Sequence, residues 1–152
     1  MIPLNQVLSV ERSFVEDFGA SKKKVLQTLA ERLATTLSSV SDLELFDQLI
    51  ARERLGSTGI GLGVAVPHCR LNGLSQPIAA LVKLPQGIDF EAIDKAPVDL
   101  IFALIVPIDA TDEHLQLLAS VVERVNNPET LEQIRNSTSS TALFNQFVGA
   151  NP

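Results

Sequence analysis

The residues best suited to chemistry lie between positions 52 and 70, where a glycine-rich stretch is followed by a histidine, His68. Glycines at positions 56, 59, 61 and 63 make this stretch a pliable loop. The apolar residues 64–66 predict a brief strand, which Pro67 ends because proline has no N–H for a neighbouring strand. His68 then lies at the end of a strand, with room for one ring nitrogen to face outward. We interpret it as a nucleophile that carries a phosphoryl group from one protein to another.

An imidazole can perform this chemistry with few additional groups. Its unperturbed pKa is about 6.5, so the neutral ring is abundant at neutral pH and its lone pair can attack phosphorus. The phosphohistidine that forms is a covalent intermediate, which divides one transfer into two steps. The reaction also needs a cation or hydrogen-bond donors at the phosphoryl oxygens, and open access for the partner. The candidate groups are Arg52, Arg54, Ser57, Thr58 and His114.

Each candidate also has an ordinary structural explanation. Arg52 and Arg54 fall in the last turn of a predicted helix, where the helix dipole favours a cation whether or not it has a function. His114 opens another predicted helix, and a lone histidine there is commonly a surface residue. The N-terminus of that helix nevertheless favours an anion, so His114 stays a candidate hydrogen-bond donor to the phosphoryl group.

Other kinds of site fit the sequence less well. A phosphate-binding P-loop ends in Gly-Lys-Ser/Thr, whereas Val64 follows Gly63 here, and a dinucleotide site has its glycines between a strand and a helix, the reverse of this order. Two histidines and one cysteine lack the paired spacing of a metal site, and no Gly-x-Ser-x-Gly motif is present. Cys69 as a thiol nucleophile is a weaker interpretation than a structural cysteine. We expect no metal and no other cofactor.

Composition narrows the class of protein further. The chain has 152 residues, of which 45% are hydrophobic and 20% charged, as in an ordinary globular domain. A net charge of −6 and the lack of a basic stripe argue against nucleic acid as a ligand. No apolar run approaches the roughly 20 residues of a membrane span, and no signal peptide is evident. With a single cysteine and hence no internal disulfide, we expect a cytoplasmic protein.

Apolar periodicity predicts the elements that position these residues. The predicted helices follow Ser21 for about sixteen residues, cover residues 42–54, begin at Thr111 or Asp112, and cover 129–136 and 141–148. In the helix after residue 111, the residues Leu115, Leu118, Val122 and Val125 form an apolar helical stripe. The predicted strands cover residues 13–18, 78–84 and 98–106, with a turn at 85–87. The strand at 98–106 is almost wholly apolar, which is typical of a strand covered by helices on both faces. The alternation predicts one α/β domain over residues 1–152.

The segment from Gly56 to Gly61 (Gly-Ser-Thr-Gly-Ile-Gly), followed by Val-Ala-Val-Pro-His at residues 64–68, resembles the active-site signature of a known family. The family is the enzyme IIA proteins of the bacterial phosphotransferase system (PTS), mannitol/fructose class, and the likeness is greatest to its nitrogen-related branch. The resemblance extends over nearly the whole chain, through residues 90–94, residues 97–100 and the His114-Leu115 pair.

The resemblance implies a fold, a site and partners. It implies a mixed β-sheet flanked by helices, with His68 as the phosphorylated histidine, Arg52 as the active-site arginine and His114 as the second histidine. The phosphoryl donor would be a small histidine phosphocarrier protein. In the nitrogen-related branch, the phosphorylation state would regulate other proteins, such as potassium transporters or sensor kinases. Two positions depart from the family, Cys69 where glycine is usual and Leu62 where asparagine is common.

Two other functions are compatible with the same residues. One is a sugar-specific IIA component of the fructose or mannitol type that passes the phosphoryl group to a IIB domain. The other is a regulatory binding module in which phosphotransfer is vestigial or serves only as a switch.

Overall fold

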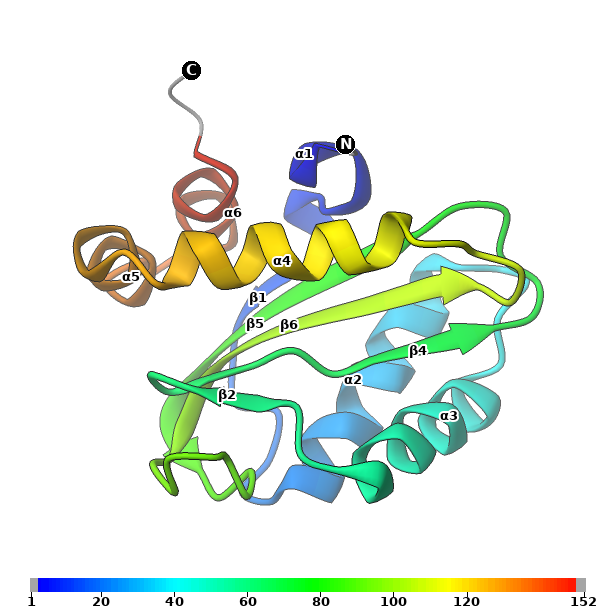
Figure 1. The fold of residues 1–152 in the computed structure, drawn as a ribbon, viewed down its shortest axis with the longest axis horizontal. Coiled ribbons are helices and arrows are strands. Elements are labelled where there is room, and N and C mark those ends of the chain that lie inside the picture. Colours follow the sequence, from blue (N-terminus) through cyan, green and yellow to red (C-terminus); the bar gives the residue numbers. More distant parts are fainter. Residues whose placement is uncertain (1–2, 150–152) are drawn as a thin grey trace.

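The structure, a computed structural model, describes residues 3–149 apart from the side chains of residues 113–115. Six strands form one mixed sheet in the order β1-β5-β6-β3-β2, with β4 also paired to β6 (Figure 1). The strands are β1 (Ser13–Val15), β2 (Gly59–Gly61), β3 (Val64–Ala65), β4 (His68–Leu71), β5 (Ile78–Ile88) and β6 (Val98–Pro107). The helices are α1 (Leu4–Val7), α2 (Lys22–Thr36), α3 (Asp42–Leu55), α4 (Glu113–Val125), α5 (Pro128–Arg135) and α6 (Ser140–Val148), with a short 3₁₀ turn, η1 (Val10–Arg12).

Serine caps determine where the two long N-terminal helices begin. The Ser21 side chain accepts a hydrogen bond from the backbone N–H of Lys24, and that of Ser41 accepts one from Glu44. Each cap satisfies an N–H that has no partner within the helix. The caps place α2 and α3 as the sequence predicts and fix Arg52 in the last turn of α3.

Strand β6 is the centre of the sheet. It pairs antiparallel with β5, and on its other side it pairs parallel first with β3 and then with β4. Its alternate side chains enter two separate apolar clusters, one shared with α2 and α3 and the other with α1, α4, α5 and α6. Figure 1 shows these two helical layers on opposite faces of the sheet. The predicted α/β fold, with a mixed sheet flanked by helices, is confirmed.

Three local predictions differ from the structure. His68 does not end a strand but begins β4, because the chain resumes pairing with β6 after Pro67. The predicted turn at residues 85–87 is an irregular section of β5, where the register with β6 shifts between Lys83 and Ile88. The glycine loop is itself partly a strand, β2, which forms a hairpin with β3.

The predicted stripe of α4 is confirmed at Val125 and wrong at Val122. The buried positions of this helix are Leu117, Val121 and Val125, whereas Val122 is 42% exposed. Leu118 is only partly buried, and the side chain of Leu115 lies outside the described residues. Apolar residues occur on both sides of this helix, so periodicity alone does not identify the side that faces the sheet. Among the helices of residues 3–149, none is both long and apolar enough to cross a bilayer.

Candidate functional site

His68 lies at a break in the strands that border β6. Strand β3 pairs with β6 up to Ile101, and β4 pairs with it from Leu104 onward. Between them, Val66 donates its N–H to the Thr58 carbonyl at 2.9 Å, and the Pro67 carbonyl accepts from Leu104 at 3.0 Å. The backbone on each side of the histidine is therefore held by the sheet, while the ring is only half-buried.

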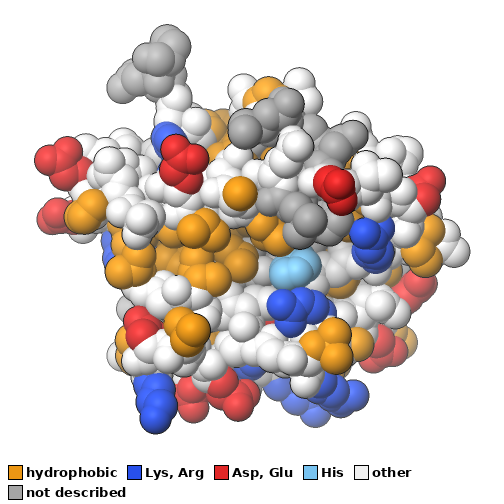
Figure 2. Space-filling model, viewed as in Figure 1, with side chains coloured by type: hydrophobic (Ala, Val, Ile, Leu, Met, Phe, Trp, Pro, Cys, Tyr) orange, Lys and Arg blue, Asp and Glu red, His pale blue; other side chains and the backbone are white. Residues whose placement is uncertain are grey.

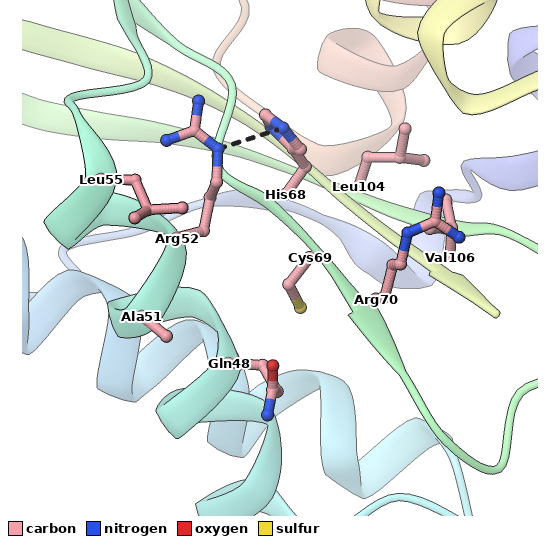
Figure 3. Close-up of a pocket in the computed structure, with 9 residues that line it drawn as sticks. All are labelled: Gln48, Ala51, Arg52, Leu55, His68, Cys69, Arg70, Leu104 and Val106. Atoms are coloured by element: carbon pink, nitrogen blue, oxygen red, sulfur yellow. Dashed lines mark hydrogen bonds between the residues drawn. The ribbon is translucent and has the colours of Figure 1, made fainter. Parts of the chain in front are cut away.

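The His68 ring has a defined orientation and tautomer. Its Nδ1 lies 2.9 Å from the carbonyl oxygen of Val66. A carbonyl can only accept a hydrogen bond, so Nδ1 carries the proton and Nε2 carries the lone pair. Nε2 in turn accepts a hydrogen bond from Nε of Arg52 at 3.4 Å (Figure 3). The nucleophilic nitrogen thus faces a cation.

Arg52 reaches the histidine from the last turn of α3. Its Nη1 donates to the carbonyl of Gly56 at 2.8 Å, which holds the guanidinium against the start of the glycine-rich segment. A guanidinium matches the geometry of phosphate oxygens, and its charge is close to the site of attack. The structure therefore brings together two of the three predicted site residues, His68 and Arg52.

Arg54 points to a different part of the surface. It lines a cavity of about 660 Å³ together with residues of α2 and α3, among them Lys22 and Glu53, and His68 does not line that cavity. Of the two candidate arginines, only Arg52 lies beside the histidine.

His114 is the second residue of α4, but its side chain lies outside the described residues. Its predicted role as the second site histidine therefore stays a prediction.

An open cavity of about 390 Å³ lies against the ring. It is lined by Gln48, Ala51, Arg52, Leu55, His68, Cys69, Arg70, Leu104 and Val106 (Figure 3). Figure 2 shows a histidine at the surface, beside a cationic side chain and an apolar area. The site can therefore be reached from outside, as an approaching partner protein requires.

The hydroxyls of Ser57 and Thr58 are not available as donors to a phosphoryl group. Ser57 donates to the carbonyl of Phe90 at 2.7 Å, and the buried Thr58 donates to the carboxylate of Glu53. The prediction that these hydroxyls face the site is wrong, because both are used to fasten the loop to its surroundings.

Cys69 faces away from His68, as successive residues of a strand do. Its side chain joins the core cluster shared with α2 and α3 and is 8% exposed. Burial raises the pKa of the thiol to about 12, so the thiol is protonated at neutral pH. A protonated, buried thiol is a poor nucleophile, which supports the structural interpretation of this cysteine.

The sequence interpretation missed two residues near the site. Arg70 lies two positions after His68, on the same face of β4, and its Nη1 donates to the carbonyls of Ile108 and Ala110 at 3.2 and 2.5 Å. Strand periodicity could have identified Arg70. Glu53 is buried behind the loop, and nothing in the sequence distinguishes it from a solvated helix residue. Among the described residues, no group of three or more His, Cys, Asp or Glu side chains is placed to hold a metal ion.

Known proteins resemble this chain in sequence and in fold. Residues 6–148 match the family described as "Phosphoenolpyruvate-dependent sugar phosphotransferase system, EIIA 2". The chain is 44% identical to the nitrogen regulatory protein of Pseudomonas aeruginosa over 144 residues, which are 95% of this chain and 94% of that protein.

Solved structures give the same result. The crystal structure of the nitrogen regulatory protein IIA-Ntr from Neisseria meningitidis superposes with a TM-score of 0.89 at 33% identity, covering 95% of this chain and 98% of that one. The crystal structure of IIA mannitol from Escherichia coli has a TM-score of 0.75 at 19% identity, covering 91% and 97% of the two chains, and so shares the fold.

Proposed function

The chain belongs to the EIIA 2 family of the phosphoenolpyruvate-dependent sugar phosphotransferase system, as its sequence predicts, and on that premise we propose that Nε2 of His68 accepts a phosphoryl group from a histidine phosphocarrier protein. The observation that carries the proposal is the hydrogen bond from Nδ1 of His68 to the Val66 carbonyl. It leaves the lone pair on Nε2, the nitrogen beside Arg52 at an open cavity.

The transfer is an in-line displacement at phosphorus. The Nε2 lone pair forms a new P–N bond while the P–N bond of the donor's phosphohistidine breaks, and the donor imidazole keeps that electron pair. The proton on Nδ1 of His68 stays in place, and its hydrogen bond to Val66 stabilises the charge that the ring gains on attack. The guanidinium of Arg52 stabilises the phosphoryl oxygens.

The role we propose is regulatory. The relative in Pseudomonas aeruginosa and the solved relative in Neisseria meningitidis are both named as nitrogen regulatory proteins. A phosphoryl group adds about −1.5 to −2 charges at the open site of a chain whose net charge is −6. Such a change alters which surfaces bind there, so the phosphorylation state would select the proteins that are regulated.

Transfer from phosphoenolpyruvate tests the first part. The chain is incubated with enzyme I, the phosphocarrier and phosphoenolpyruvate, and the modified residue is mapped by mass spectrometry at alkaline pH, where phosphohistidine survives. We expect one phosphoryl group on His68 and none on a His68→Gln variant. A His114→Gln variant keeps the modification at His68. Modification of His68→Gln would contradict the assignment.

Arginine variants test the electrostatic part of the same reaction. Arg52→Ala is expected to slow phosphoryl uptake on the order of 10- to 100-fold, because a charge-assisted contact to the phosphoryl oxygens is lost. Arg54→Ala is the matched control. Arg54 lies two residues after Arg52 and carries the same charge, but its side chain lines another cavity. Equal rates for the two variants would show that Arg52 is only a helix-end residue.

Binding assays separate the regulatory role from the alternatives. We expect His68→Ala, which cannot be phosphorylated, and His68→Asp, which adds a fixed charge, to retain different sets of partner proteins. Identical partners for both variants would contradict a phosphorylation switch. Onward transfer of the phosphoryl group to a IIB protein would favour the sugar-specific alternative.

A further inference from the structure

The carboxylate of Glu53 is the most fully enclosed charged group near the site. The side chain follows Arg52 in α3 and is 4% exposed. Burying a carboxylate costs free energy unless its oxygens are paired, so its partners indicate its role. Oε1 accepts the backbone N–H of Thr58 at 3.1 Å and lies 2.9 Å from Nζ of Lys22, and Oε2 accepts the hydroxyl of Thr58. The carboxylate therefore binds one residue, Thr58, at two points.

A continuous set of contacts leads from Thr58 to the ring of His68. The carbonyl of Thr58 accepts the N–H of Val66 at 2.9 Å, and the carbonyl of Val66 accepts the Nδ1 proton of His68 at 2.9 Å. Glu53 thus holds the peptide that orients Val66, and Val66 determines the tautomer of the histidine.

The same segment also supports the arginine. Gly56 donates its N–H to the backbone carbonyl of Glu53 at 3.1 Å, and its own carbonyl accepts from Nη1 of Arg52 at 2.8 Å. The three residues from Gly56 to Thr58 are therefore bound to the end of α3 by both the backbone and the side chain of Glu53. They are the common support of the two groups at the site.

Lys22 completes the arrangement from α2. Its ammonium group pairs with Glu53 and lies 4.8 Å from the centre of the Phe90 ring, whose backbone carbonyl accepts the hydroxyl of Ser57. The carboxylate is therefore paired with Lys22, which also lies 3.7 Å from a carboxylate oxygen of Glu91, beside a cavity that His68 does not line. Glu53 can therefore hold the loop without placing an unpaired charge of the same sign next to the incoming phosphoryl oxygens.

We propose that Glu53 is a positioning residue for phosphoryl transfer, which through Thr58 and Val66 holds the His68 ring with Nδ1 protonated and Nε2 presented to the donor. The inference rests on the proposed function, in which Nε2 of His68 accepts the phosphoryl group. It assigns the loop a purpose beyond that of a tight connection. A ring that exchanges tautomers, or that shifts by about 1 Å, no longer presents Nε2 in line with the donor. The rate of phosphoryl transfer then falls on the order of 100-fold.

Glu53→Gln and Thr58→Val test the proposal. Glutamine keeps the shape of Glu53 and removes its charge, and valine keeps the shape of Thr58 and removes its hydroxyl. The readouts are the ¹⁵N chemical shifts of the His68 ring, which report the tautomer, and the rate of phosphoryl uptake. For Glu53→Gln we expect a mixture of tautomers in place of Nδ1–H alone and a rate 10- to 100-fold lower. Thr58→Val, which loses one of the two contacts, gives a smaller change in the same direction.

Two controls separate positioning from stability. Glu31→Gln makes the same charge change at an exposed position of α2 and leaves both readouts unchanged. Val121→Ala creates a cavity in the core on the α4 side, so it lowers stability without changing the tautomer. A folded Glu53→Gln protein with the wild-type ring spectrum and rate would overturn the proposal. Should that variant not fold, an unchanged Thr58→Val would overturn it.

The ring spectrum keeps this inference distinct from the proposed function. If wild-type protein takes up no phosphoryl group at His68 while Glu53→Gln still changes the tautomer, the proposed function fails, but the positioning of the ring by Glu53 is supported. If wild-type protein takes up the phosphoryl group normally and neither variant changes the tautomer of His68, only the positioning role of Glu53 is contradicted.

Discussion

Two neighbouring residues of β4 differ in burial. His68 has its ring half-buried in an open cavity, where Nε2 meets Arg52, whereas Cys69, although it borders that cavity, is buried with its side chain in the core cluster shared with α3. The alternation of a strand alone produces this difference. Cys69 borders the same cavity as His68 but is only 8% exposed, so its side chain takes up little of the surface that a partner would approach.

The reactivity of Cys69 tests this placement. Because burial raises the thiol pKa to about 12, almost no thiolate exists in the folded protein at pH 8, whereas an unfolded chain has the ordinary pKa of about 8.5. Alkylation by iodoacetamide at pH 8 is therefore expected to be on the order of 1,000-fold slower in native protein than in urea.

The same difference in pKa has a consequence for stability. Below pH 8 the thiol is protonated in both states and contributes no pH dependence. As the pH rises from about 8.5 toward 12, only the unfolded state loses the proton, so the free energy of unfolding falls. Cys69→Ala removes this part of the pH dependence.

For the alkylation test, equally fast reaction of native and unfolded protein would show that the thiol of Cys69 is exposed to solvent.

The sequence predicts His68 and Arg52, and the structure brings them together. The histidine after Pro67 is a local feature that pattern can reveal, whereas pattern left Arg52 and Arg54 equivalent and only the family resemblance singled out Arg52. The directions of the Ser57 and Thr58 hydroxyls depend on the Phe90 carbonyl and on Glu53. Phe90 is distant in sequence, and Glu53 differs from its neighbours only by burial. Local pattern contains neither fact.

At the scale of elements, the β2–β3 hairpin has an unusual turn. Leu62 and Gly63 connect its strands with φ of 61° and 76°. Two consecutive residues with positive φ match the twist of a tight hairpin, which is why asparagine and glycine are favoured there. Leucine in this conformation costs about 1–2 kcal/mol. The turn is held by Asp94, which accepts the Leu62 N–H at 3.2 Å, and by Arg135, which donates to the Leu62 carbonyl.

Glycine and alanine variants measure that cost. Leu62→Gly and Leu62→Ala lose the same contacts, so their difference reports the backbone alone. We expect Leu62→Gly to be more stable than Leu62→Ala by about 1 kcal/mol in urea denaturation. At Gln27, an exposed position within α2, the order reverses, with Ala more stable than Gly by about 1 kcal/mol. The same order at both positions would contradict the left-handed conformation of Leu62.

Element boundaries show which predictions depend on tertiary structure. The caps at Ser21 and Ser41 are local, and both helices begin where the sequence predicts. Residues 85–87 have the composition of a turn, yet the chain continues along β6 because Ile88 resumes pairing with Val98. Pro85 lies in the interrupted part of the ladder, where a missing N–H costs nothing. Whether a proline ends a strand or interrupts it depends on the neighbouring strand.

At the scale of the whole molecule, Arg135 connects the C-terminal helical layer to the β2–β3 hairpin that precedes His68. From the last turn of α5 its Nη2 pairs with Asp99 of β6 at 3.0 Å and also donates to the Leu62 carbonyl. Gly63, in the same turn, accepts the backbone N–H groups of Asp99 and Leu100 at 3.0 and 3.1 Å. The guanidinium lies where a side chain on Gly63 would be, so the turn, β6 and α5 are packed as one unit.

Arg135→Met tests whether this contact holds the hairpin on the sheet. Because the ion pair is about one-third exposed, we expect the free energy of unfolding to fall by only about 1–2 kcal/mol. Amide hydrogen exchange at Asp99 and Leu100 is expected to accelerate, since both donate to Gly63, while exchange at Leu104, which donates to Pro67 next to His68, stays unchanged.

Arg124→Met is the matched control for that experiment. Arg124 donates to the Phe147 carbonyl and so joins α4 to α6 within the same helical layer, without contact to the hairpin. Its loss lowers stability but leaves exchange at Asp99 and Leu100 at the wild-type rate. If Arg135→Met leaves those two amides equally protected, the hairpin is held by its own strand pairing, and the C-terminal layer has no direct hold on the segment that leads to His68.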